Sequence, residues 1–292
     1  MASEHRLALV EIGASEKPWN SATTLYIARK IQEIAGGRRL QVLDMGCGQG
    51  QAISLLQGYG HALYGFDLPD KSEALKAALG PIFGDAFDEH IRFMADERCI
   101  PFESGHFDII YANQVFEHVR FLDQMLAECA RVLKPDGSLI TLFPLATYPL
   151  EGHSLIPFAH WLPPGRFRRA YLRAFLTLGI GRRLPGWTVS QAVTEWDDRL
   201  QQFTFYRFMN EFQSLFTYYF DECSLDAGEY VRAKADLLQT SGVARNRRVG
   251  RLLERVRGKR LASLVTHGFM AVFVARRPKA VDRRQRVVEW RH

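Results

Sequence analysis

The sequence lacks the signatures of several protein classes. None of its four cysteines lies in a CxxC motif. This disfavours a zinc site or a disulfide framework, so no metal is expected. It has no run of about 18 apolar residues to span a membrane, and its N-terminus lacks the basic start and apolar core of a signal peptide. These absences predict a cytoplasmic protein that is neither exported nor membrane-spanning, with at most a peripheral membrane contact.

Acidic residues are missing from one basic stretch. Residues 166–183 hold six arginines and no acid, and residues 276–292 hold seven Lys/Arg against two acids. The rest of the chain is close to neutral, although the formal net charge is +6. A basic tail is able to bind nucleic acid. The sequence contains no recognisable RNA-binding module, however, so nucleic acid is disfavoured as a partner.

The basic stretch also has the pattern of an amphipathic helix, with apolar residues on one side and arginines on the other. This pattern is typical of a lid helix with a solvated arginine face. It also suits peripheral docking on a membrane through 155–187, or a phosphate-bearing acceptor. The expected apolar side consists of Phe167, Tyr171, Phe175 and Leu178.

Short apolar runs alternate with segments of helical periodicity along most of the chain. Strands are expected within "LQVLDMG", "ALYGFD", "IRFMAD", "FDIIYAN" and "SLITLFP", and helices over 22–35, 52–60, 71–80 and 121–133. Further strands are expected within 218–231 and 268–278, and a basic helix over 249–265. Strands alternating with helices predict an α/β fold whose mostly parallel sheet is covered on both faces.

Proline, glycine and aromatic residues interrupt this alternation after residue 148. We expect a helical, aromatic-rich insertion in the α/β domain, because about 65 residues are few for an independent core. The predicted segments are an N-terminal segment and candidate lid (1–21), the core (22–147), the insertion (148–212), the remainder of the core (213–277) and a basic tail (278–292).

The stretch "VLDMGCGQG" over 42–50 carries glycine at every second position. Fixed glycines lose much conformational entropy, so such a cluster indicates tight turning or a ligand close to the backbone. A Walker loop would need a lysine here, and the dinucleotide fingerprint would need glycine in place of Gln51. Asp44 would repel a pyrophosphate but attract an ammonium group, which points to a nucleoside that bears an amino acid.

Acids also close the next two predicted strands, at Asp67 and Asp96. In an open parallel sheet, ligands bind beyond the carboxyl ends of the strands, near the point where the strand order reverses. One such acid could be a helix cap, but three at successive strand ends indicate a binding site.

Taken together, "VLDMGCGQG", "LYGFDL", "ADERCIPFESGHFDIIYANQVFEHV" and "ARVLKPDGSLITLFP" resemble the class I S-adenosylmethionine-dependent methyltransferases, particularly their small-molecule and quinone branch. The resemblance covers roughly 40–144, and "GFMAVFVARRP" resembles the family's terminal strand. It implies a Rossmann-like sheet, mostly parallel with an antiparallel last strand, and S-adenosyl-L-methionine as the cofactor. It also places the insertion above the cofactor, as an acceptor pocket or lid.

The resemblance assigns roles to the strand ends. It implies that the glycine loop wraps the methionine part, that Asp67 accepts hydrogen bonds from both ribose hydroxyls, and that Asp96 meets the adenine amino group. Asn113 would face the methionine ammonium with its carbonyl. The cofactor-binding residues implied are Asp44, Gly46, Cys47, Gly48, Gly50, Asp67, Leu68, Asp96, Glu97, Asn113 and Gln114.

The transferred methyl would sit on a sulfonium, so the leaving group needs little acid catalysis. A hydroxyl nucleophile needs in-line placement and a base, for which histidine is suited by its unperturbed pKa near neutrality. The candidates are His118, His153 and His160, with Glu151 as a weaker one. We expect His153 or His160 to be the base, since His118 also reads as a residue that packs under the cofactor.

The sequence therefore predicts an S-adenosylmethionine-dependent methyltransferase that O-methylates a small or lipid-like molecule with a general-base histidine. Carbon and nitrogen acceptors stay open. Two alternatives remain: a non-catalytic partner subunit with a methyltransferase fold, and an RNA or protein methyltransferase.

Overall fold

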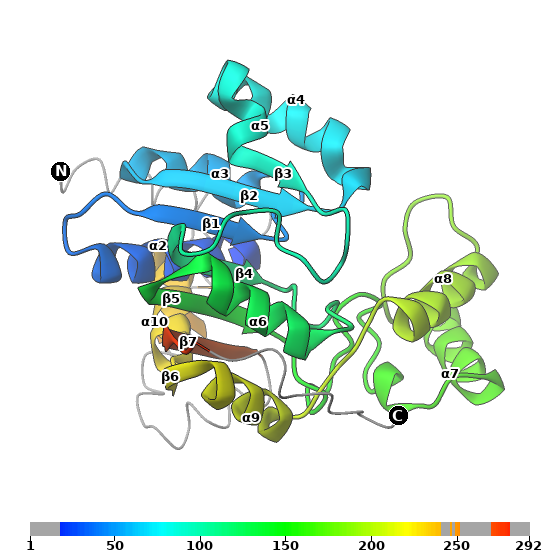
Figure 1. The fold of residues 1–292 in the computed structure, drawn as a ribbon. Helices are drawn as coiled ribbons and strands as arrows, with labels where there is room; N and C mark the ends of the chain where they lie inside the picture. Colours follow the sequence, from blue (N-terminus) through cyan, green and yellow to red (C-terminus); the bar gives the residue numbers. More distant parts are fainter. Residues whose placement is uncertain (1–17, 241–245, 247–248, 252–269, 281–292) are drawn as a thin grey trace.

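The computed structural model describes residues 18–240, 246, 249–251 and 270–280. Its centre is a seven-stranded sheet in the order β3-β2-β1-β4-β5-β7-β6 (Figure 1). The strands are β1 Gln41–Met45, β2 Ala62–Asp67, β3 Ile91–Phe93, β4 Phe107–Asn113, β5 Leu133–Phe143, β6 Phe220–Leu225 and β7 Ala271–Pro278. All neighbours pair in parallel except for β7, which is antiparallel to both β5 and β6. The predicted fold class is confirmed.

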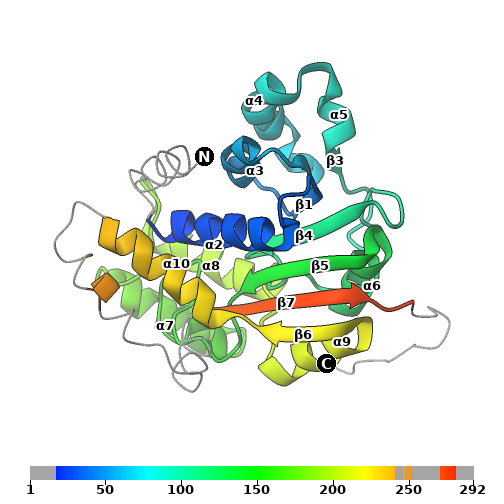
Figure 2. The same cartoon turned by 90° about the vertical axis from the view of Figure 1, so that its left-hand side faces the viewer.

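Helices cover both faces of the sheet, with α2, α3 and α10 on one side and α6 and α9 on the other (Figures 1 and 2). The helices are α2 Pro18–Ala35, α3 Gln51–Leu56, α4 Ser72–Phe83, α5 Phe87–His90, α6 Leu122–Val132, α7 Arg166–Thr177, α8 Val189–Gln202, α9 Met209–Tyr219 and α10 Ala227–Thr240.

The central strands are apolar on both faces because both faces are covered. In β1, Val42 packs toward α2 while its neighbour Leu43 packs toward α6, since successive side chains of a strand point to opposite sides. Burying a side chain of this size contributes roughly 1.5–3 kcal/mol relative to exposure. Continuous apolar runs therefore predict these strands well.

The order of the strands fixes where a ligand can bind. From β1 the chain moves outward through β2 to β3, then returns to the other side of β1 with β4. The strand order reverses at β1, so the carboxyl ends of β1, β2 and β4 lie side by side where parallel sheets bind ligands.

Two expected strand boundaries differ from the structure. β3 ends at Phe93, three residues before Asp96, because its neighbour β2 ends at Asp67 and pairs with Phe93 there. Asp96 therefore lies in the following turn and does not close a strand. The "KPDG" turn before "SLITLFP" lies inside β5, where the pairing with β4 shifts register between Phe107 and Ile109.

Helices α7 and α8 form a lobe that projects from the end of the sheet (Figure 1). We call residues 148–208 the lobe. It has an apolar core of its own, contrary to the expectation from its length: Ile156, Ala159, Leu172, Leu176, Ala192, Val193, Trp196 and Leu200. Large side chains on two crossing helices let this short segment bury a core. Phe212 of α9 packs on the sheet instead, so residues 209–212 lie with the core.

Several predicted segments fall largely outside the described residues, namely most of 1–21, most of the basic helix over 249–265 and nearly all of the tail 278–292. Among the helices that are described, none has the length and apolar character needed to cross a membrane.

Candidate active site

The three glycines after β1 have different structural roles. Gly46, Gly48 and Gly50 all have positive φ, at 69°, 57° and 74°. A Cβ on Gly46 would lie 2.7 Å from Val115 Cγ2, and one on Gly50 would lie 2.6 Å from Leu79 Cγ, so these two permit close packing. A Cβ on Gly48 would meet nothing within 4 Å. The middle glycine thus leaves an open backbone face that a ligand can approach.

Asp67 ends β2 directly beside this loop. Its Oδ2 accepts from the Gly48 amide at 2.6 Å, and its Oδ1 accepts from the Leu68 amide at 2.7 Å. Each carboxylate oxygen keeps a second acceptor site, so two hydroxyl donors can still bind. Leu68 is 45% exposed and offers an apolar contact next to them.

Asp44 is buried beneath the loop. It pairs in register with Tyr111 of β4, and both side chains point toward α2. Burial raises the pKa of Asp44 to about 8, against the opposing effect of the Tyr111 hydroxyl. No described Lys or Arg forms an ion pair with it. A bound ammonium group would favour the ionised carboxylate, as the sequence predicts.

The chain leaves β4 abruptly at Asn113 and Gln114. Gln114 has a φ of 55°, and its amide donates to the Leu142 carbonyl at 2.7 Å. The Asn113 side-chain oxygen is buried and has no hydrogen-bond partner in the described part of the chain. A buried acceptor of this kind normally has a donor.

The remaining predicted cofactor residues are less clearly placed. Cys47 is buried, its amide donates to the Phe66 carbonyl at 3.1 Å, and burial raises the pKa of its thiol, so it contributes its backbone to the loop. Asp96 and Glu97 are exposed in the turn after β3, where Asp96 Oδ1 accepts from the Arg98 amide at 2.9 Å. Their role toward adenine stays a prediction.

The site suits S-adenosylmethionine by its own chemistry. Four features lie together at one sheet edge. They are an open glycine face, a carboxylate with spare acceptor sites, a buried acid that forms no described ion pair, and a buried amide oxygen that has no described hydrogen-bond partner. The loop would hold the amino-acid part and Asp67 the ribose.

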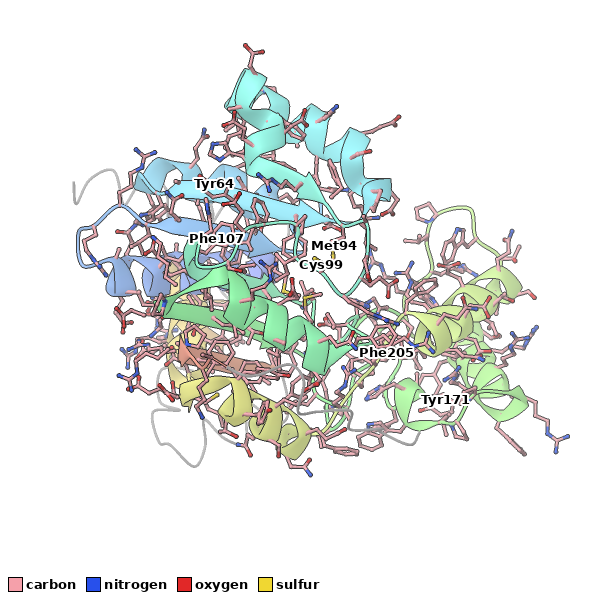
Figure 3. All side chains as sticks on the ribbon, in the orientation of Figure 1. Tyr64, Met94, Cys99, Phe107, Tyr171 and Phe205 are labelled. Carbon is pink, nitrogen blue, oxygen red and sulfur yellow. The ribbon has the colours of Figure 1, made fainter. Side chains whose placement is uncertain are left out.

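The lobe brings two of the predicted histidines together. His118 Nε2 lies 3.2 Å from His153 Nε2. His118 Nδ1 lies 2.5 Å from the Phe203 carbonyl oxygen, and His153 Nδ1 lies 2.8 Å from Glu151 Oε1. Figure 3 shows Phe205, whose amide donates to the Glu117 carbonyl at 2.6 Å, where the lobe meets the sheet.

Glu151 is fully buried but ionised. Its carboxylate accepts from the Ser154 amide at 2.6 Å and the Tyr206 hydroxyl at 2.9 Å, besides His153. Burial opposes ionisation, but the hydrogen bonds and charge of His153, with the bonds from Ser154, lower its pKa to about 2. The contact at 2.8 Å holds the His153 ring in place.

His160 makes no described hydrogen bond with that pair. Its Nε2 contacts the Ala146 carbonyl at 3.2 Å, while its buried Nδ1 has no partner in the described chain. Its ring centre lies 4.6 Å from that of Tyr206. Burial lowers the pKa of His160.

Sequence reasoning missed Tyr206 and Glu117. Tyr206 lies 55 residues after its partner Glu151, and no spacing links them. Burial raises the pKa of Glu117 to about 8, and its buried Oε2 has no hydrogen-bond partner in the described chain. The only sequence signal for Glu117 was that a charged residue directly precedes the candidate His118.

Two arginines of the stretch 166–183 pair with a carboxylate in the structure, so its positive charge is partly neutralised. Arg168 is buried and pairs with Asp197 at 2.5 Å, and Arg169 reaches the same carboxylate at 2.6 Å. The predicted apolar side is also only partly correct, because Phe167 of α7 and Leu178 directly after it are 70% and 74% exposed. Arg168 occupies the inner face in their place.

Comparisons with known proteins point to methyltransferases. Residues 43–141 match the methyltransferase domain family. The ubiquinone biosynthesis O-methyltransferase of Thiobacillus denitrificans is 32% identical over 97 residues, covering 33% of this chain and 41% of that protein. Its counterpart from Caulobacter vibrioides is 29% identical over 149 residues, covering 47% and 57%. The chain thus spans about half the length of these relatives.

Among solved structures, the geranyl diphosphate C-methyltransferase of Streptomyces coelicolor is similar with a TM-score of 0.45 and 14% identity, covering 87% of this chain and 79% of that one. This likeness is too weak to bear on function.

The sheet order and the glycine loop define a class I methyltransferase fold. Together with the family match over 43–141, this fold supports a class I S-adenosylmethionine-dependent methyltransferase.

Proposed function

We propose that the protein transfers a methyl group from S-adenosylmethionine to a hydroxyl group of a small or lipid-like molecule. The observation that carries this proposal is the chain of contacts from Glu151 through His153 to His118, which begins in the lobe and ends at the edge of the sheet that holds the glycine loop. The relatives named as ubiquinone biosynthesis O-methyltransferases support an oxygen acceptor.

The cofactor supplies a methyl group on a positively charged sulfur, so its leaving group needs no proton. The loop around Gly48 would bind the amino-acid part through its backbone, and Asp44 would balance the ammonium charge. Asp67 would accept from the ribose hydroxyls while its bonds to Gly48 and Leu68 hold it in place. Binding of this kind orients the methyl group toward the acceptor.

An acceptor hydroxyl must lose its proton as it attacks, and His153 suits that task better than His160. Glu151 fixes the His153 ring, whereas His160 already uses Nε2 on a backbone carbonyl. Replacing a general base commonly lowers turnover by about 10²–10⁴-fold. We expect this loss for His153→Ala, with unchanged cofactor affinity, and a smaller one for His160→Ala. Wild-type turnover in both variants would contradict a histidine base.

Two measurements test the function as a whole. Isothermal titration with S-adenosylmethionine should detect binding, and its absence would overturn the proposal. A screen for S-adenosylhomocysteine release, run on cell-extract fractions separated by polarity, should respond in the apolar fractions. A response only in nucleic-acid or protein fractions would instead identify an RNA or protein methyltransferase, and silence throughout would indicate a non-catalytic partner subunit.

We further propose that the lobe docks on an anionic membrane surface, from which a lipid-like acceptor could enter. Phe167 and Leu178 are mostly exposed, and the Arg166 guanidinium lies 5.0 Å from the Phe167 ring centre. Exposed aromatic and aliphatic side chains beside arginines suit an interface of acyl chains and anionic headgroups. The exposed arginines of this part of the lobe are Arg166, Arg169, Arg173, Arg182 and Arg183.

Liposome sedimentation tests this surface. Vesicles with anionic lipid should retain the wild type, and the double variant Phe167→Ser, Leu178→Ser should lose most of that retention without loss of folding, because both side chains are already exposed. Leu55→Ser removes a partly exposed leucine from α3, remote from the lobe, and should behave as wild type. Equal retention of all three proteins would contradict membrane docking.

A further inference from the structure

The contact between His118 and His153 contains a hydrogen-bonding mismatch. His118 Nδ1 must donate, because its partner at 2.5 Å is the Phe203 carbonyl oxygen, which can only accept. His153 Nδ1 must also donate, because Glu151 is a carboxylate that already accepts from Tyr206. A neutral imidazole carries one N–H. Two neutral rings would therefore point bare Nε2 lone pairs at each other across 3.2 Å.

A single additional proton resolves the mismatch by forming an N–H···N bond between the two rings. The surroundings place that proton on His153. The Glu151 carboxylate lies against His153. Partial desolvation of the ring lowers the pKa of His118 although the residue as a whole is exposed; the charges of His153 and Arg199 add to this effect, and the Phe203 carbonyl and Glu151 oppose it. The nearby Glu117 is mostly protonated at pH 7, with a pKa of about 8.

The pair lies close to the cofactor end of the sheet. His118 follows Gln114 by four residues, and its amide donates to the Val115 carbonyl at 2.8 Å, forming a tight turn. The same Val115 side chain packs over the site where a Gly46 Cβ would stand. One short turn therefore joins the glycine loop to the histidine pair.

We propose that His118 and His153 act as one proton-accepting pair in the methyl transfer proposed above, on which this inference rests. The acceptor hydroxyl approaches the gap between the two Nε2 atoms, its O–H bond breaks, and its proton moves to His153 Nε2, where His118 Nε2 shares it. The electron pair left on oxygen forms the bond to the methyl carbon, whose bond to sulfur breaks with both electrons staying on sulfur. The proton then leaves to water beside His118, which is exposed.

Two further residues act through the pair. Glu151 and Tyr206 are positioning residues, because Glu151 contacts His153 and Tyr206 contacts Glu151. Glu151 also supplies the negative charge that stabilises the protonated pair.

Nitrogen-15 NMR of the histidine rings tests the pair without cofactor or acceptor. Between pH 5 and 9, both Nδ1 atoms should show the shift of a protonated nitrogen throughout, and the two Nε2 atoms should change together in one coupled step. In His118→Asn, whose amide can still donate to the Phe203 carbonyl, the remaining ring should titrate at lower pH because its N–H has lost an acceptor. An unmoved titration, or an unprotonated Nδ1 on either ring, would overturn the proposal.

Kinetics test the positioning role. In Glu151→Gln the rise of kcat with pH should move to lower pH, because the protonated pair loses its counter-charge, while the affinity for S-adenosylmethionine stays within about twofold. Tyr206→Phe should shift the profile in the same direction by less. Glu103→Gln removes the same charge from an exposed position after β3 and should leave the profile unchanged. If the pH dependence of kcat in Glu151→Gln matched that of the wild type, Glu151 would not be a positioning residue.

The two proposals fail in different ways. Undetectable binding of S-adenosylmethionine would overturn the methyltransferase function and leave the NMR titration as it is. Independent titration of the two rings would overturn the pair and leave cofactor binding and methyl transfer intact.

Discussion

The two halves of the candidate site are assembled over very different distances along the chain. At the cofactor end, Gly48 bonds to Asp67 across 19 residues, within one strand-helix-strand unit. On the lobe side, His118 reaches Phe203 across 85 residues and Glu151 reaches Tyr206 across 55. A site built from one supersecondary unit leaves a motif in the sequence, and a site built by docking a lobe does not.

The halves also differ in what holds them in place. The predicted cofactor residues lie at strand ends of a sheet covered on both faces, with Val42 and Leu43 fully buried. The lobe instead encloses a small apolar core beside a buried ion pair, Arg168 with Asp197. A small core makes the lobe depend more on a few specific interactions.

The largest expected effect is therefore in the lobe. Asp197→Asn leaves buried Arg168 without its counter-charge, and breaking a buried pair in this way costs about 3–5 kcal/mol. Trp187 and Trp196 lie in contact within the lobe, so tryptophan fluorescence during urea unfolding should report the loss. Far-UV circular dichroism of the sheet and the affinity for S-adenosylmethionine should change little.

Asp198→Asn is the matched control for that change. Asp198 is half-buried and lies 3.8 Å from Arg169, so removing its charge should alter stability by less than about 1 kcal/mol. If Asp197→Asn lowered the fluorescence and circular dichroism transitions equally, the lobe and the sheet would be one cooperative unit and the contrast between them would fail.

The same contrast explains what could be predicted from the sequence. Apolar runs such as "ALYGFD" and "FDIIYAN" coincide with β2 and β4 because burial on both faces demands continuous apolar residues. β3 was predicted too long because its length depends on where β2 ends, which is a matter of pairing between strands. Glycine spacing predicted the loop for a similar reason, since backbone geometry is local.

The lobe side could be predicted only as a set of separate candidates. His118, His153 and Glu151 were all recognised as chemistry-bearing residues, but their order in the chain gives no hint of the contacts that join them. Arg168 looked like one more solvated arginine because its partner Asp197 lies 29 residues away on another helix. Tyr206 was missed because a lone tyrosine in an aromatic stretch commonly packs in a hydrophobic core and gives no functional signal.

A second prediction tests whether the glycine loop is open to the cofactor. Gly48 and Gly60 both have positive φ, and a Cβ on either would meet nothing within 4 Å. Replacing either by alanine should therefore cost a similar amount of stability, roughly 1–2 kcal/mol for a side chain in left-handed backbone. Only Gly48→Ala should also weaken S-adenosylmethionine binding, by about tenfold or more, in isothermal titration. Equal affinities would place the cofactor elsewhere.

The smallest expected effect concerns the junction of the two halves, where the Glu117 carbonyl accepts from Phe205 and the Glu117 side chain is buried. Burial raises the pKa of Glu117 to about 8 in the folded protein, above its ordinary value of 4.5. As pH rises between these values, the unfolded chain releases its proton first, so the free energy of unfolding falls. Asp44, also raised to about 8, adds to this fall. Glu151, lowered to about 2, loses its stabilising contribution only below about pH 4.5 and stays constant in this window.

Glu117→Gln removes one titrating group and keeps the shape of the side chain. Urea unfolding at pH 5 and pH 8 should therefore show a smaller fall in the free energy of unfolding for the variant than for the wild type, by a difference on the order of 1 kcal/mol or more. Comparing each protein with itself at two pH values cancels any constant packing cost of the amide. Parallel pH dependences would mean that Glu117 ionises normally in the folded state, and that the junction between sheet and lobe admits water.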